Sequence, residues 1–306
     1  MFVFHIGLPK TATTSLQYDY FPQLVYSNQA LYIGLNQPRH LCRQSQAYHS
    51  INNYISGDST LESARSVLDA LSANYKVIIF SDEMILVSSA YASWQTKLAR
   101  LATLVHCYDF RILLAVRDPI NASISYYVER YSSFFSKSYS ECFQKENDFQ
   151  IYNYSYLLDL IYSLGLAQSI DVVYFEDLIK NPRLALNPIH KHLSPHFTDK
   201  PFPVIRNRNT KNTLLERLRE RPNIIAFYSN QNKVLRVLIR VCLALPMVSQ
   251  LFAQILKRFF SEKLYIVSKE SISDDEINAA REVNDLRYEK YGNWSTFMRN
   301  SVIGHD

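Results

Sequence analysis

Four short apolar runs constrain the fold of this 306-residue chain more than any other feature of its sequence. Each run is rich in β-branched or aromatic residues, and helical spacing of apolar residues separates it from the next. The runs are residues 2–6, 75–80, 110–116 and 170–175, with a shorter candidate strand at residues 32–34. Continuous apolar strands are typical of a parallel sheet that helices cover on both faces. We therefore predict an α/β fold with an open, mostly parallel sheet.

Composition and length fit a folded protein with one large domain. Apolar residues make up 47% of the chain and charged residues 20%, which is normal for a folded soluble protein. The net charge of +5 suits an anionic ligand but is too small to indicate a nucleic-acid-binding protein. We predict a single domain, residues 1–306, in which 1–210 form the α/β core and 211–306 a helical extension that includes a helix at 274–291.

The first apolar run ends in a turn that contains a lysine and opens a helix. Gly7 and Pro9 break the strand, Lys10 follows, and Thr and Ser residues fill positions 11–15 apart from Ala12. Thr and Ser are favoured at helix starts, where unpaired N–H groups attract an anion. The nucleotide-binding pattern G-x-x-x-x-G-K-[ST] does not fit, because Lys10 comes only three residues after Gly7 and no Gly precedes it directly.

This stretch resembles the 5′-phosphosulfate loop of the sulfotransferases that use 3′-phosphoadenosine 5′-phosphosulfate (PAPS), written G-x-P-K-[TS]-G-[TS]-[TS]. The matching residues are Gly7, Pro9, Lys10, Thr11, Thr13 and Thr14. Ala12 stands where the family usually has Gly, and Ala resists the positive φ that Gly permits. A second family signature, R-x-P-x-x-x-x-x-S-x-[YF], matches Arg117, Pro119, Ser125 and Tyr127.

The resemblance implies a PAPS-dependent sulfotransferase, similar to the bacterial enzymes that act on carbohydrates, with a sheet of the nucleotide-kinase type. It implies that Arg117 and Ser125 hold the 3′-phosphate, and it assigns the 5′-phosphosulfate to Pro9, Lys10, Thr11, Ala12, Thr13, Thr14 and Ser15. A late basic loop closes over the 3′-phosphate in this family, and the candidates here are Arg206, Arg208 and Lys211. PAPS would leave as the 3′,5′-bisphosphate (PAP), and no metal is expected because no carboxylates show metal-ligand spacing.

Transfer to a hydroxyl also requires a general base. Glu83 follows the apolar run 75–80, and carboxylates at the C-terminal end of a buried parallel strand lie at the ligand-binding edge of such a sheet. We rank Glu83 first, Asp82 second and a His of the 40–49 segment third. Lys10 is expected to stabilise the charge that develops on the leaving group. The aromatic and polar segment 18–56 suits a glycan or glycolipid acceptor, with Arg39 and His40 as candidate contacts.

Two other functions fit parts of the sequence. One is an ATP-dependent P-loop phosphotransferase, and the other is a non-catalytic scaffold that binds a partner through the apolar residues 234–256. Arg236, Arg240 and Pro246 interrupt that run, so we predict two helical segments in a core or a partner surface, with an interfacial membrane helix over 234–258 as the alternative. No secretory or anchor pattern opens the chain, which favours the cytoplasm, with a peripheral contact at the inner membrane surface as the alternative. Residues 131–150 are expected to form a mobile loop.

Overall fold

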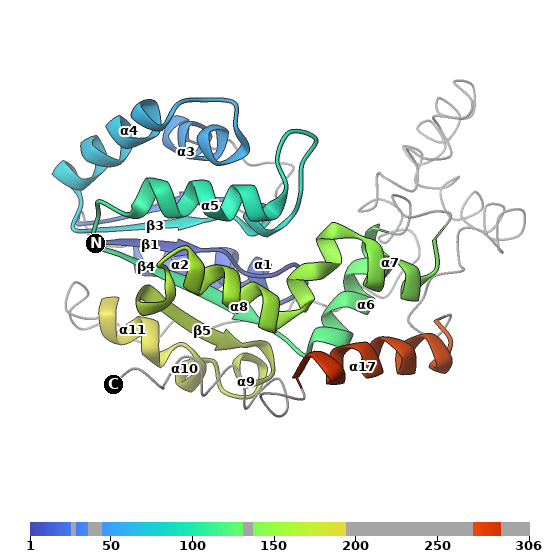
Figure 1. The fold of residues 1–306 in the computed structure, drawn as a ribbon. Coiled ribbons are helices and arrows are strands. Elements are labelled where there is room, and N and C mark those ends of the chain that lie inside the picture. Colours follow the sequence, from blue (N-terminus) through green and yellow to red (C-terminus); the bar gives the residue numbers. More distant parts are fainter. Residues whose placement is uncertain (26–28, 36–44, 131–136, 194–271, 289–306) are drawn as a thin grey trace, which may run out of the picture. The chain divides into compact units, whose positions relative to one another are not determined.

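The computed structural model describes residues 1–25, 29–35, 45–130, 137–193 and 272–288 (Figure 1). The chain groups into two compact units. The first consists of residues 1–122, 145–207 and 282–306, and the second of residues 123–144 and 208–281. All strands of the sheet belong to the first unit. The division into a core up to residue 210 and a helical extension after it stays a prediction.

Five strands form one parallel sheet in the order β2-β3-β1-β4-β5, which confirms the predicted α/β class. The strands are β1 (Phe2–His5), β2 (Ala30–Gly34), β3 (Val77–Ser81), β4 (Phe110–Val116) and β5 (Ile170–Tyr174). From β1 the chain moves outward to β2 on one side, and from β4 it moves outward to β5 on the other. The topology therefore reverses between the neighbours β1 and β4. In open α/β sheets, ligands bind outside the carboxyl ends of the strands at such a switch point.

Helices connect the strands in the positions that the apolar spacing indicates. The elements of the first unit are α1 (Thr13–Ser15), which continues as the π-helix η1 (Leu16–Tyr20) and α2 (Phe21–Leu24), then α3 (Gln46–Ser56), α4 (Leu61–Asn74), η3 (Glu83–Leu86), α5 (Trp94–Val105), η5 (Asn147–Tyr152), α8 (Tyr154–Ser163), η6 (Ala167–Ser169), α9 (Phe175–Lys180), α10 (Pro182–Ala185) and α11 (Asn187–Leu193). The elements α6 (Pro119–Arg130), α7 (Tyr139–Lys145) and α17 (Asp274–Tyr288) each include residues of both units.

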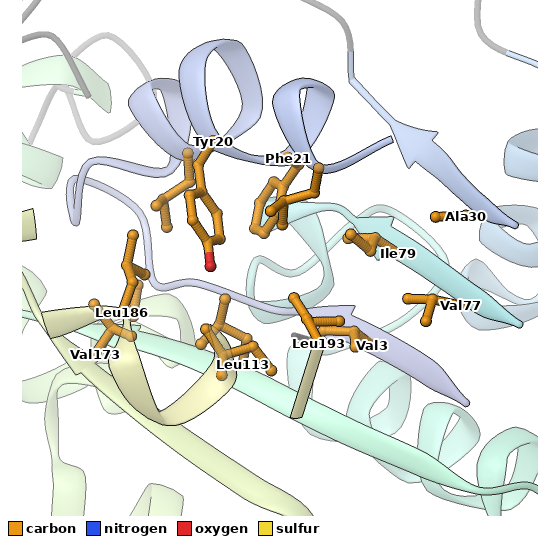
Figure 2. Close-up of a cluster of buried hydrophobic side chains, with 14 of the residues drawn as sticks. Val3, Tyr20, Phe21, Ala30, Val77, Ile79, Leu113, Val173, Leu186 and Leu193 are labelled. Carbon is orange, nitrogen blue, oxygen red and sulfur yellow. The ribbon is translucent and has the colours of Figure 1, made fainter. Parts of the chain in front are cut away.

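Aromatic side chains fix the helix that follows β1 onto one face of the sheet. Figure 2 shows Tyr20 and Phe21 above Leu113 and the other strand residues of this cluster. Both rings are completely buried. Burial of an aromatic or aliphatic side chain of this size contributes about 1.5–3 kcal/mol. On the opposite face, Tyr48 of α3 stacks on Phe80 with 5.5 Å between ring centroids. The sheet is thus covered on both faces, which explains its unbroken apolar strands.

The prediction of a mobile loop over residues 131–150 is wrong where the structure describes this segment. Residues 139–145 form α7 and residues 147–152 form η5. The polar side chains that indicated a loop alternate with aromatic ones that point inward, and Tyr139, Phe143 and Phe149 are buried. The indole N–H of Trp94 donates to the carbonyl of Asn147 at 3.0 Å and ties this segment to α5.

The alternative prediction of an interfacial membrane helix concerns a segment that the structure does not describe. Residues 234–258 lie outside the described residues. Among the described residues, no helix is long enough and apolar enough to span a membrane.

Candidate functional site

The loop after β1 folds back tightly onto the end of β4. The N–H of Leu8 donates to the carbonyl of Ala115 at 3.1 Å, so pairing with β4 continues beyond the strand itself. The hydroxyl of Thr11 donates to the carbonyl of Leu8 at 2.6 Å and closes the turn. Gly7 makes this possible, because a Cβ there would lie 2.6 Å from Cγ2 of Thr13 and 2.7 Å from Nε2 of His5.

Two residues of the loop adopt the left-handed conformation. Lys10 has φ 71° and Ala12 has φ 63°. Ala12 is therefore strained at the position where the sulfotransferase pattern has Gly, at a cost of about 1–2 kcal/mol. Left-handed residues next to a helix start bend the backbone so that successive N–H groups form an anion-binding concavity.

The N–H groups of residues 11–14 are available at the start of the helix. None of the four donates a hydrogen bond to another residue of the described ranges, and Ala12 gives no side-chain cap. The first N–H groups of a helix need an external acceptor and carry a partial positive charge. The loop of residues 7–14, called the anion-binding loop below, therefore offers a row of main-chain donors to an anion. That these residues hold the 5′-phosphosulfate stays a prediction.

Arg117 joins the second signature to the first. It follows β4, and its Nη1 donates to the carbonyl of Lys10 at 3.3 Å. Its guanidinium lies over the ring of Phe175, with 4.4 Å from Cζ to the ring centroid. The hydroxyl of Tyr154 bonds both the carbonyl and the N–H of Arg117 and fixes its main chain. Lys10 and Arg117 thus meet at the switch point between β1 and β4.

Carboxylates hold the start of α6. Oδ1 of Asp118 accepts from the N–H of Asn121 at 2.8 Å, and the N–H of Asp118 donates to Oε1 of Glu176 at 3.0 Å. Glu176 therefore orients this turn. Ser125 lies further along α6, half-buried and within the second unit. That Ser125 holds the 3′-phosphate of PAPS stays a prediction.

The two candidate carboxylates after β3 have different surroundings. Glu83 is half-buried, and its Oε2 accepts a hydrogen bond from the hydroxyl of Thr13 in the loop. Asp82 is buried and accepts from the hydroxyl of Tyr48 at 2.7 Å and from the N–H of Met84 at 2.8 Å. Asp82 thus stabilises its own turn, whereas Glu83 contacts the anion-binding loop. The role of Glu83 as the base stays a prediction.

His5 is a polar residue of this region that the sequence reasoning passed over. It is completely buried at the end of β1, and its Nδ1 lies 2.8 Å from Oγ of Ser81. Gln17 also donates to that Oγ, at 3.2 Å. Burial lowers the pKa of His5 to about 3, so the ring stays neutral at physiological pH. A histidine inside an otherwise apolar run was the signal available in the sequence.

Several predicted contacts cannot be placed. Arg39, His40, Arg206, Arg208 and Lys211 lie outside the described residues. His49, the other histidine of the third-ranked segment, is exposed on α3. A search of the described ranges for three or more His, Cys, Asp or Glu residues that could share a metal ion finds no such group.

Similarity to known proteins is found among solved structures. No family model and no curated protein matches the chain. Among solved structures, it is similar to a sulfotransferase from Alicyclobacillus acidocaldarius, with 15% identity, a TM-score of 0.42, and coverage of 78% of this chain and 95% of that one. It is also similar to the sulfotransferase domain of the Synechococcus PCC 7002 olefin synthase, with 17% identity, a TM-score of 0.35, and coverage of 63% and 72%. Both TM-scores are below 0.5, so neither similarity assigns an activity to this chain.

Proposed function

We propose that this chain transfers the sulfuryl group of PAPS to a hydroxyl of a carbohydrate acceptor. The observation that supports this most is the hydrogen bond from Arg117 to the carbonyl of Lys10. It brings a main-chain anion site and a guanidinium together at the edge where an open α/β sheet binds ligands. A nucleotide with phosphate groups on both its 3′ and 5′ sides requires two such anion sites close together.

The residues of the loop suit the 5′ end of PAPS. The N–H groups of residues 11–14 are donors without an acceptor in the described ranges, and Lys10 adds a positive charge. Arg117 suits the 3′-phosphate, because a guanidinium has five N–H donors in a planar fork. Among the described residues, the Lys10 carbonyl is the one hydrogen-bond acceptor of this guanidinium, which leaves its other N–H groups to a phosphate.

The proposed mechanism assigns a separate role to each group. Bound PAPS supplies an activated sulfuryl group and leaves as PAP. Lys10 and the loop N–H groups stabilise the charge that develops on the bridging oxygen, and donors of this kind are each worth about 2.7–4 kcal/mol. Glu83 accepts the proton of the attacking hydroxyl, a role worth roughly a hundred- to ten-thousand-fold in rate. The hydroxyl of Thr13 orients the Glu83 carboxylate.

Labelled transfer and ligand binding test this proposal. Purified protein is incubated with PAPS carrying ³⁵S and a panel of glycans, glycolipids and simple alcohols, and labelled products are counted with and without EDTA. We expect transfer to at least one glycan, unaffected by EDTA because no metal is required. Lys10→Ala should abolish transfer, and Glu83→Gln should lower turnover while PAP affinity is kept. Lys76→Ala is the matched control, because Lys76 is exposed just before β3 begins, at the opposite end of that strand.

Thermal unfolding with nucleotides separates sulfuryl transfer from phosphoryl transfer. A ligand that binds only the folded chain at a hundred times its Kd stabilises it by about 2.7 kcal/mol. PAP should therefore raise the melting temperature, whereas ATP with Mg²⁺ should not. If ATP with Mg²⁺ raises the melting temperature and PAP does not, the ATP-dependent phosphotransferase replaces our proposal. A chain that binds PAP but transfers to no acceptor, and whose cellular role survives Lys10→Ala, would instead be a binding scaffold.

A further inference from the structure

A buried lysine lies behind the turn that carries Glu83. Lys97 belongs to α5, and only 4% of its surface is exposed. Its ammonium donates to the carbonyl of Val87 at 2.8 Å and to the carbonyl of Met84 at 3.1 Å. Lysine is almost never fully buried unless it is paired. Burial lowers the pKa of Lys97, while the nearby charges of Asp82 and Asp148 oppose that shift.

The two carbonyls that Lys97 holds belong to one short turn. Met84 lies within η3, and Val87 is the residue that ends it. Glu83 is the first residue of the same turn, and its carboxylate accepts from Thr13. Asp82 holds the start of the turn through the N–H of Met84. Lys97 is therefore bonded to the backbone of the turn that begins with Glu83.

We infer that Lys97 is a positioning residue for Glu83: its ammonium fixes the Glu83–Leu86 turn so that the carboxylate stays at the Thr13 hydroxyl and the anion-binding loop. This inference rests on the proposed function and on Glu83 as the base. Without the ammonium, both carbonyls would lose a charged donor, and the Met84 carbonyl would keep only the N–H of Val87 at 3.3 Å as its backbone donor. The end of the turn at Val87 would then have to shift to find another donor. A displacement of about 1 Å in a catalytic group can lower the rate a hundredfold.

A double-mutant cycle tests the inference. Lys97→Met keeps the length of the side chain and removes its donors. The variant is measured in the wild-type and the Glu83→Gln backgrounds for kcat, for the KM of PAPS and for the Kd of PAP. We expect kcat to fall about 10- to 100-fold in the wild-type background, with KM and Kd within about twofold. In the Glu83→Gln background, Lys97→Met should change kcat by less than about twofold, because residues that act through one another are not additive.

Two further variants keep the test decisive. Lys76→Met makes the same substitution at an exposed position and should leave all constants unchanged. If Lys97→Met unfolds below the assay temperature, Lys97→Gln keeps an uncharged NH2 group with two N–H donors and should show the same pattern with a smaller fall in kcat.

Three results would overturn the inference. They are a full kcat in Lys97→Met, an equal fall in kcat in both backgrounds, and a loss of PAP binding that matches the loss of turnover. Each of these leaves the proposed function intact, because wild-type transfer is still observed. Failure of the proposed function would be recognised separately, by a wild-type chain that neither binds PAP nor transfers sulfate, and it would remove the basis of the inference as well.

Discussion

Replacement of Gly7 by Ala probes the packing on which the anion-binding loop depends. The new Cβ would lie 2.6 Å from Cγ2 of Thr13, 2.7 Å from Nε2 of His5 and 3.3 Å from Cβ of Ala115. The φ of Gly7 is not in the left-handed region, so the cost comes from these contacts and not from backbone strain. His5 is completely buried and packs 5.0 Å from the ring of Phe21, so it has no open space to move into.

The side chain and backbone of Thr13 must therefore move away from the new Cβ. Overpacking of this kind costs about 1–3 kcal/mol. In a large domain, 1 kcal/mol corresponds to a fall of about 2–4 °C in melting temperature, so we expect a fall of about 2–12 °C. A shift of Thr13 also moves the N–H row and the hydroxyl that bonds Glu83. PAP affinity should consequently fall together with stability.

Gly165→Ala is the matched control. Gly165 has φ 71° and no atom within 4 Å of the position of a Cβ, so this substitution strains the backbone without a steric contact. The left-handed conformation costs about 1–2 kcal/mol for Ala, less the roughly 0.4–1 kcal/mol that Ala gains in the unfolded chain. Differential scanning calorimetry and PAP titration are run on both variants. An undiminished PAP affinity in Gly7→Ala, or an equal loss in Gly165→Ala, would refute the reasoning.

Three other changes test separate features of the site. Ala12→Gly should relieve about 1–2 kcal/mol of left-handed strain against about 0.5–1 kcal/mol of added chain entropy, so chemical denaturation should show a stability that is equal or up to about 1.5 kcal/mol higher. Arg117→Ala should weaken PAP binding more than any other single change in the second signature, and calorimetric titration measures this; an unchanged Kd would remove Arg117 from the site. Burial in the folded chain lowers the pKa of His5 from 6.5 to about 3. Between these pH values the unfolded chain binds a proton on His5 that the folded chain does not bind. The folded state therefore loses stability as the pH falls from 6.5 towards 3. His5→Gln should reduce that slope by about 1.4 kcal/mol per pH unit, which unfolding at pH 4–7 checks; an unaltered slope would show that His5 is not buried in its neutral form.

The apolar strands were predictable because burial on both faces leaves a strong local pattern. The predicted run at residues 110–116 coincides with β4, and the runs 2–6 and 170–175 each extend one residue beyond β1 and β5. The run 75–80 begins two residues before β3 and ends one residue before the end of that strand. A helix end can also have a local signal: α8 ends at Ser163, and Gly165, with φ 71°, follows two residues later. The segment that forms α7 and η5 was not, because only the tertiary environment reveals which of its many aromatic residues point inward.

By itself, the sequence determined the strands, the helix starts and the chemistry available at the end of each strand, since these depend on neighbours within a few residues. The tertiary structure decided which of those ends meet. Arg117 and Lys10 are 107 residues apart, and Glu83 and Thr13 are 70 apart. They meet because β1 lies between β3 and β4, and strand order is a property of the whole sheet that no local pattern records. The neutral His5 and the buried Lys97 have the same origin, since burial exists only once the distant elements have packed.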